Sequence, residues 1–102
     1  MSEEAGSEGA KIQDISSLDT YSLIGLFIGL LSVKAWETMG LRVKPGTDKI
    51  EMDLDQARTA IDTIDFIVQK LKSRIPESDR SRLESLVADL KLNFARVSQP
   101  TS

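Results

Sequence analysis

The chain has 102 residues and a net charge of −3, which leaves room for one domain with one hydrophobic core. It contains no cysteine and no histidine, so it has no disulfides, no thiolate chemistry and no imidazole as general base or zinc ligand. The acidic balance offers no basic face to nucleic acid. We therefore expect neither an enzyme nor a nucleic-acid-binding protein, with no cofactor and no metal. The missing cysteine favours the reducing cytoplasm.

The first segment, residues 1–17, is predicted to be a disordered acidic arm. Within residues 1–15, Ile12 and Ile15 are the only large apolar residues after Met1. Such a stretch buries too little apolar surface to offset the entropy lost on ordering. The alternative is a docking tail that these two isoleucines anchor elsewhere. The acidic start lacks the basic region of a secretory signal, so we expect no export signal.

Residues 18–39 are predicted to form a helix that is apolar on every side. Its apolar run, residues 21–33, is interrupted only by two serines. Ser17 or Asp19 can cap the start, and Gly40 can end the helix in the left-handed conformation. A helix that is apolar all round is either buried on all sides or in lipid. Because a membrane span needs about 20 residues, we favour a buried helix and keep membrane contact as the alternative.

Small residues recur along this helix at steps of three and four, at Ser22, Gly25, Gly29 and Ser32. A glycine inside a helix costs about 1 kcal/mol of helix propensity, which indicates that close packing against another backbone offsets the cost. We refer to these four residues as the small-residue strip. The strip and its neighbours predict the oligomer interface, which comprises Ser22, Gly25, Leu26, Gly29, Leu30, Ser32, Val33 and Trp36.

The expected oligomer is a homo-dimer, with a tetramer as the second choice, and a further protein partner stays open. Two amphipathic helices can cover only one side of an apolar helix. Its other side would then expose several large residues, which we expect among Leu23, Leu26, Phe27, Leu30 and Leu31. Because a soluble monomer rarely exposes such a patch, we predict a structural or protein-interaction module that acts as a homo-oligomer. The alternative is a membrane-associated protein with this helix inserted in or lying on the bilayer.

Residues 41–52 read as a linker, with a turn signal at Pro45-Gly46. An alternative is a short hairpin about that turn, formed by Leu41, Val43, Ile50 and Met52.

Residues 53–74 are predicted to form a second helix, because their apolar residues recur with the clearest helical period in the chain. Asp53 and Gln56 form a start that resembles a capping box, and Pro76 should stop the helix near Arg74. The apolar positions alternate steps of three and four, as in a helical seam: Leu54, Ala57, Ile61, Ile64, Val68, Leu71 and Ile75. Phe66 lies off this seam, so it either widens the core or marks a second contact surface.

A third helix is predicted over residues 77–97, with Pro76 in its first turn. Its apolar positions recur at helical spacing: Leu83, Leu86, Val87, Leu90, Phe94 and Val97. The short link from the preceding helix predicts an antiparallel hairpin. The fold class is therefore all-α. The hairpin packs on the apolar helix in a single domain over residues 18–97, and residues 98–102 form a frayed tail.

Charged and aromatic residues outside the seams suggest no catalytic or metal site. Asp55, Asp62 and Asp65 lie mostly on the outer side of the second helix, where a solvated face is the simplest interpretation. Pairs four residues apart, Arg58–Asp62 and Arg80–Glu84, can bridge one helical turn. Trp36 and Tyr21, near the ends of the apolar helix, are expected to pack in a core or interface, with a ligand pocket as the alternative.

The segment over residues 52–72 resembles a bacterial family of short helical proteins, domain of unknown function 1844. The resemblance covers roughly residues 18–97. The matching residues are Pro45-Gly46, Leu54, Ala57, Arg58, Ile61, Asp62, Leu83, Leu86, Leu90 and Val97. The chain departs from the family at Thr63 and Asp65, and at Ile75-Pro76, where the family more often has a threonine cap. The resemblance implies an all-helical fold and no assigned chemistry.

Overall fold

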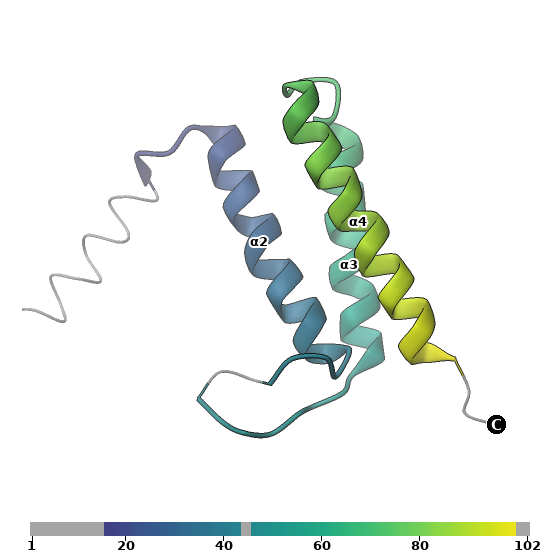
Figure 1. The fold of residues 1–102 in the computed structure, drawn as a ribbon. Coiled ribbons are helices and arrows are strands. Elements are labelled where there is room, and N and C mark those ends of the chain that lie inside the picture. The colour runs from purple at the N-terminus through teal and green to yellow at the C-terminus, as the bar shows by residue number, and fades with distance from the viewer. Residues whose placement is uncertain (1–15, 44–45, 100–102) are drawn as a thin grey trace, which may run out of the picture.

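The computed structural model describes residues 16–43 and 46–99. Residues 1–15 of the predicted arm, Pro45 of the predicted turn and the end of the predicted tail lie outside these residues. Three helices follow one another along the chain: α2 (Thr20–Thr38), α3 (Leu54–Leu71) and α4 (Glu77–Ser98). Figure 1 shows α3 and α4 side by side, both on the same side of α2. The predicted all-α class and the hairpin on the apolar helix are confirmed.

Aspartate side chains cap α2 and α3. Asp19 accepts a hydrogen bond from the Ser22 N–H at 2.8 Å, and Asp53 accepts one from the Gln56 N–H at 3.1 Å. These bonds satisfy N–H groups that have no partner within a helix, and the bond from the Ser22 backbone lowers the pKa of Asp19. The Gln56 side chain donates to the Asp53 carboxylate. The Asp53 N–H instead donates to the Thr38 carbonyl oxygen at 2.8 Å, which ties α3 to the end of α2.

The end of α2 is closed by Gly40, as predicted. Gly40 has a φ of +80°. Its N–H donates to the Glu37 carbonyl oxygen, and the Leu41 N–H donates to the Trp36 carbonyl oxygen, both at 3.0 Å. This pair of bonds is a Schellman motif. In place of the alternative hairpin, the described part of the linker contains one isolated antiparallel bridge, between residues 39 and 52.

The hairpin differs from its predicted boundaries at three points. α3 ends at Leu71 rather than near Arg74, because the Arg74 N–H turns back to the Leu71 carbonyl oxygen at 2.7 Å. Pro76 caps α4 from outside instead of lying in its first turn, and α4 continues through Ser98, which was assigned to the frayed tail. The antiparallel arrangement depends on none of these shifts.

The core lies between α2 and the hairpin, and α2 packs mainly on α3. The buried side chains come from one face of each helix and from the end of α2: Ile28, Ala35, Met39, Ala57, Ala60, Ile61, Ile64, Val68, Leu71, Val87 and Leu90. Complete burial of one large aliphatic side chain is worth about 1.5–3 kcal/mol. The predicted α3 seam therefore supplies the centre of the core.

The surfaces of α3 and α4 carry an exposed phenylalanine and short-range ion pairs. Phe66 is 64% exposed. Of the two interpretations of this residue, widening of the core is therefore wrong, and a second contact surface stays a prediction. Arg58 and Asp62 approach to 3.8 Å, as predicted. Arg80 lies 3.9 Å from Glu77 instead of pairing with Glu84. α4 begins at Glu77, which places that side chain one helical turn before the arginine.

Replacing Gly40 with alanine should destabilise the fold by about 1–2 kcal/mol, because a residue with a Cβ atom resists the left-handed conformation. The new Cβ would lie 3.0 Å from the Met52 Cε atom, at the flexible end of its side chain. Urea unfolding followed by circular dichroism measures the loss. Gly40→Asn is the matched control and should lose less, because asparagine tolerates this conformation better. Equal losses would show that contact with Met52, rather than backbone conformation, limits this position.

The ion pair between Asp65 on α3 and Lys91 on α4, at 2.7 Å, should make stability depend on pH. The hydrogen bond from Lys91 is the main cause that lowers the pKa of Asp65 below its ordinary value of 3.8. The stabilisation is therefore fully present above that value and is lost as the pH falls through the lowered pKa.

Asp65→Asn should cost less than about 1 kcal/mol at neutral pH, because the pair is partly exposed. Urea unfolding between pH 7 and pH 2 should show the variant and the native chain converging at acid pH. Asp62→Asn, in the looser exposed pair with Arg58, should change stability less at neutral pH. A difference between Asp65→Asn and the native chain that persists unchanged at acid pH would contradict an ionic contribution.

Candidate functional site

Helix α2 carries apolar seams on two opposite sides. With about 100° per residue, the inner seam consists of Ile24, Ile28, Leu31 and Ala35. Ile28 and Ala35 are buried, and the other two pack against the core. The outer seam, at steps of three, four and three on the opposite side, consists of Leu23, Leu26, Leu30 and Val33. The inner seam packs in the core against the hairpin. Because α3 and α4 lie on the same side of α2 (Figure 1), the outer seam is on the side away from the hairpin.

The outer seam is an apolar surface of α2 that is partly open to solvent. Leu30 is 58% exposed and Leu26 is 37% exposed, while Leu23 and Val33 are half-buried. Phe27, beside the seam, is 50% exposed. No charged residue occurs within residues 20–33 to interrupt this surface. Single exposed leucines are ordinary on a protein surface, whereas a contiguous exposed patch marks a contact surface.

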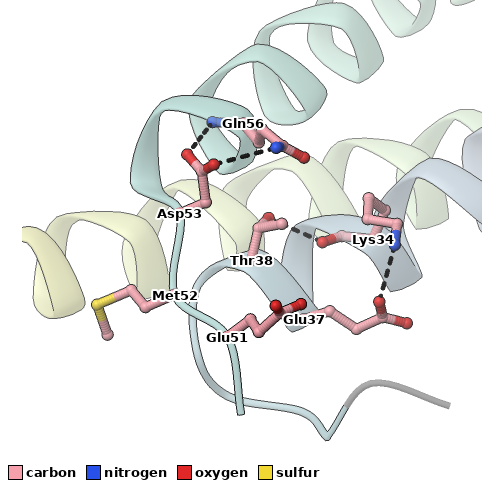
Figure 2. Close-up of a pocket in the computed structure, with 7 residues that line it drawn as sticks. All are labelled: Lys34, Glu37, Thr38, Glu51, Met52, Asp53 and Gln56. Carbon is pink, nitrogen blue, oxygen red and sulfur yellow. Dashed lines mark hydrogen bonds and ion pairs between the residues drawn. The ribbon is translucent and has the colours of Figure 1, made fainter. Parts of the chain in front are cut away.

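The outer seam ends at a corner where the linker returns to α3. Figure 2 shows the residues that line this corner, which encloses a pocket of about 370 Å³: Lys34, Glu37, Thr38, Glu51, Met52, Asp53 and Gln56. The Glu37 carboxylate is buried and lies 3.0 Å from the Lys34 Nζ atom. The Thr38 hydroxyl donates to the Lys34 carbonyl oxygen at 2.8 Å. These local bonds give the corner a structural role in joining α2 to α3.

The small-residue strip lies on a flank of α2 between the two seams. A Cβ atom built on Gly25 or Gly29 would meet nothing within 4 Å. The Ser32 hydroxyl donates to the Gly29 carbonyl oxygen of the same helix at 2.8 Å. The strip was expected to pack closely against another helix backbone. Within the described residues, no other backbone lies that close to either glycine.

One end of the strip opens onto a groove between α2 and the far end of the hairpin. The groove has a volume of about 380 Å³ and is lined by Tyr21, Ser22, Gly25, Leu71, Ile75, Asp79, Arg82 and Leu83. Its two charged residues pair with each other, since Arg82 Nη2 lies 2.7 Å from Asp79 Oδ1. The lining of the groove is therefore largely apolar, and its two charged residues neutralise each other.

The eight residues of the predicted interface fall into three groups. Leu26, Leu30 and Val33 lie on the outer seam. The small-residue strip supplies Ser22, Gly25, Gly29 and Ser32 on the flank, and Trp36 packs partly buried against the core. Leu31, which was expected to be among the exposed residues, packs against the core because it lies on the inner seam. Leu23 and Phe27 were expected to be exposed but were not assigned to the interface, and the structure places them on and beside the outer seam.

The described residues contain neither a metal site nor a membrane span. No three histidine, cysteine, aspartate or glutamate side chains within residues 16–43 and 46–99 gather closely enough to hold a metal ion. Over the same residues, no helix has the length and apolar character that crossing a bilayer requires.

Comparison with known proteins gives a family match that covers almost all of the helical region just described. No curated protein and no solved structure matches the chain. The family model described as "Domain of unknown function (DUF1844)" matches residues 21–96. These residues include the outer seam, the small-residue strip, all of α3 and almost all of α4. Because the match covers well over half of the chain, this protein belongs to the DUF1844 family.

Proposed function

We propose that this chain is a structural or protein-interaction module that acts as a homo-oligomer, with the outer seam of α2 as the surface where copies meet. The observation that carries the proposal is a helix that is apolar on both sides and that, in the part of the chain the structure describes, is packed against the hairpin on only one of them. The outer seam presents Leu26 and Leu30 to solvent on a stretch without charge. A second copy of the same surface would remove these side chains from water.

The free-energy balance supports a twofold assembly. Complete burial of one large apolar side chain is worth about 1.5–3 kcal/mol. A twofold interface uses the same surface on both copies, so every seam residue contributes twice. The resulting gain is of the same order as the roughly 4–15 kcal/mol that association costs. A dimer is therefore our first proposal and a tetramer the second.

Binding rather than catalysis is the proposed mode of action. The chain has neither histidine nor cysteine, and the polar groups at the α2–α3 corner are engaged in local bonds. We propose no cofactor, and the absence of cysteine supports a cytoplasmic setting. The alternative is a membrane-associated protein whose α2 rests on a bilayer. It is less favoured because helices that bind membrane surfaces usually carry several basic residues, whereas Lys34 is the one basic residue of α2.

Light scattering of the full chain after gel filtration should give twice the subunit mass of 11.3 kDa. The variant Leu26→Lys with Leu30→Lys should elute as a folded monomer, since two buried lysines per copy would cost more than the seam gains. Leu92→Lys is the matched control, because Leu92 is a 69% exposed leucine on α4, outside the seam. It should leave the dimer intact.

A native chain that is a well-folded monomer at all accessible concentrations would contradict the proposed homo-oligomer. Flotation of that monomer with vesicles containing anionic phospholipid would then favour the membrane alternative. Circular dichroism of each variant checks that the helices are retained, so that dissociation is not confused with unfolding.

The glycine variant Gly25→Leu with Gly29→Leu distinguishes the outer seam from the small-residue strip. Neither new Cβ atom meets a neighbour within 4 Å, and leucine favours a helix more than glycine does, so the subunit should stay folded. Because the strip lies on the flank, light scattering should still show the dimer. Dissociation of this variant, with its helices retained, would place the centre of the interface on the strip instead of the outer seam.

A further inference from the structure

We infer that the second copy docks on the outer seam in an antiparallel direction, about a twofold axis between Leu26 and Phe27. In this arrangement, Asp19 of each copy meets the partner's Lys34. The inference rests on the proposed function, because it specifies the geometry and the charge partners of the same seam.

The outer seam has an acidic residue at one end and a basic residue at the other. Asp19, the N-cap of α2, lies four positions before Leu23, and Lys34 lies four positions after Leu30, so both positions continue the outer side of α2. Lys34 also lines the corner between α2 and α3. Asp19 is exposed, and the Lys34 side chain is 51% exposed. The seam is therefore an apolar stripe bounded by opposite charges.

The charges and the leucines share one midpoint. The point halfway between Asp19 and Lys34 is also halfway between Leu23 and Leu30, and it falls between residues 26 and 27. An antiparallel pair centred there therefore sets Asp19 opposite the partner's Lys34 and Leu23 opposite the partner's Leu30. The same register satisfies the apolar contacts and both ion pairs.

A parallel pair would place like charges next to each other at both ends. Asp19 would face the partner's Asp19, and Lys34 would face the partner's Lys34, which is unfavourable. It would also align the dipoles of two adjacent helices, whereas an antiparallel pair opposes them. Charge complementarity therefore selects the antiparallel direction.

The ion pairs already present in the subunit are compatible with this contact. Lys34 lies 3.0 Å from the buried Glu37 carboxylate, but an ammonium group has three N–H donors. It can therefore keep Glu37 and take a second carboxylate. The Asp19 carboxylate accepts the bond from the Ser22 N–H that caps α2 and also interacts with the Ser22 side chain, but a carboxylate has about four acceptor sites. It can therefore keep Ser22 and accept the partner's ammonium group as well.

The hairpins do not obstruct this docking. Each hairpin covers the inner seam, on the side of α2 opposite the outer seam. In the dimer, the two α2 helices form the middle layer, and one hairpin lies on each outer side. A twofold interface of this kind is closed, since both outer seams are used and none is left for a further copy.

Disulfide cross-linking tests the direction cleanly, because the native chain has no cysteine. We would prepare Leu23→Cys and Leu30→Cys separately, with an affinity tag on one so that the two differ in mass. Each would be oxidised alone, and also after the two are unfolded and refolded together. Antiparallel docking predicts that only the mixture cross-links, and that the product carries one copy of each.

The geometry makes the two directions distinct. In the antiparallel register, two copies of residue 23 lie about 10 Å apart along the helices, while a disulfide needs Cβ atoms within about 4.5 Å. In a parallel pair, each variant would cross-link with itself. Self-linking of the Leu23→Cys variant in a confirmed dimer would overturn the antiparallel direction and leave the proposed function standing. A dimer in which no combination cross-links would overturn docking on the outer seam, whereas a native chain that is a monomer would overturn the proposed function itself.

The end charges are tested separately by Asp19→Asn, which removes the charge but keeps a good helix cap. The dissociation constant measured by sedimentation should rise about 2- to 30-fold at low salt, because two partly exposed ion pairs are lost per dimer. Added salt should shrink this difference. Asp55→Asn, in the first turn of α3, removes a charge away from the seam and should leave the constant unchanged. Equal effects of the two variants would contradict the pairing of Asp19 with the partner's Lys34.

Discussion

The covering of α2 is the constraint on which the rest of the structure depends. Its apolar residues point to all sides, while α3 and α4 each bring a single apolar stripe. The hairpin buries Ile28 and Ala35 and packs on Ile24 and Leu31. It cannot reach the outer seam on the opposite side, because a helix is too thick for neighbours on one side to wrap around it. Within residues 16–43 and 46–99, the fold therefore leaves an apolar surface on α2 that the hairpin does not cover.

The corner between α2 and α3 sets the direction of that surface. The closure of α2 at Gly40 and the bond from the Asp53 N–H to the Thr38 carbonyl oxygen hold the end of α2 next to the start of α3, across the linker. Because α3 is then held against one side of α2, the rotation of α2 is determined, and with it the identity of the exposed residues. A structural corner thus decides which leucines form the outer seam.

Much of this fold could be predicted from local chemistry. The stripe of α3 and its charged back identify its buried face, and Asp19, Asp53 and Gly40 mark helix ends through their capping preferences. The end of α3 was predicted too late, near Arg74. Pro76 sets how far the preceding helix can extend, but it does not determine at which earlier residue the helix ends. The inner and outer seams of α2 could not be separated in the same way. With no charged residue over residues 20–33, the sequence of α2 does not show which of its sides faces the core. Leu31 was therefore grouped with four residues among which exposed side chains were expected, whereas it packs on the core.

The candidate interface shows the same limit. The small-residue strip was selected from the sequence because glycine lowers helix propensity, and close packing would offset that cost. In the described subunit, however, no other backbone lies within 4 Å of a Cβ atom built on either glycine. The outer seam was hidden within a uniformly apolar run, and only the packing of the opposite side reveals it. Charge placement then adds what hydropathy lacks, since Asp19 and Lys34 give the seam two distinguishable ends.

The most direct test of this account is the thermal unfolding midpoint of the native chain, measured over about a hundred-fold range of protein concentration. If a second copy covers the outer seam, association stabilises the folded state, and the midpoint must rise with concentration. A midpoint that stays constant over the whole range, with one cooperative transition, would show that the subunit folds without a partner copy and would contradict the account.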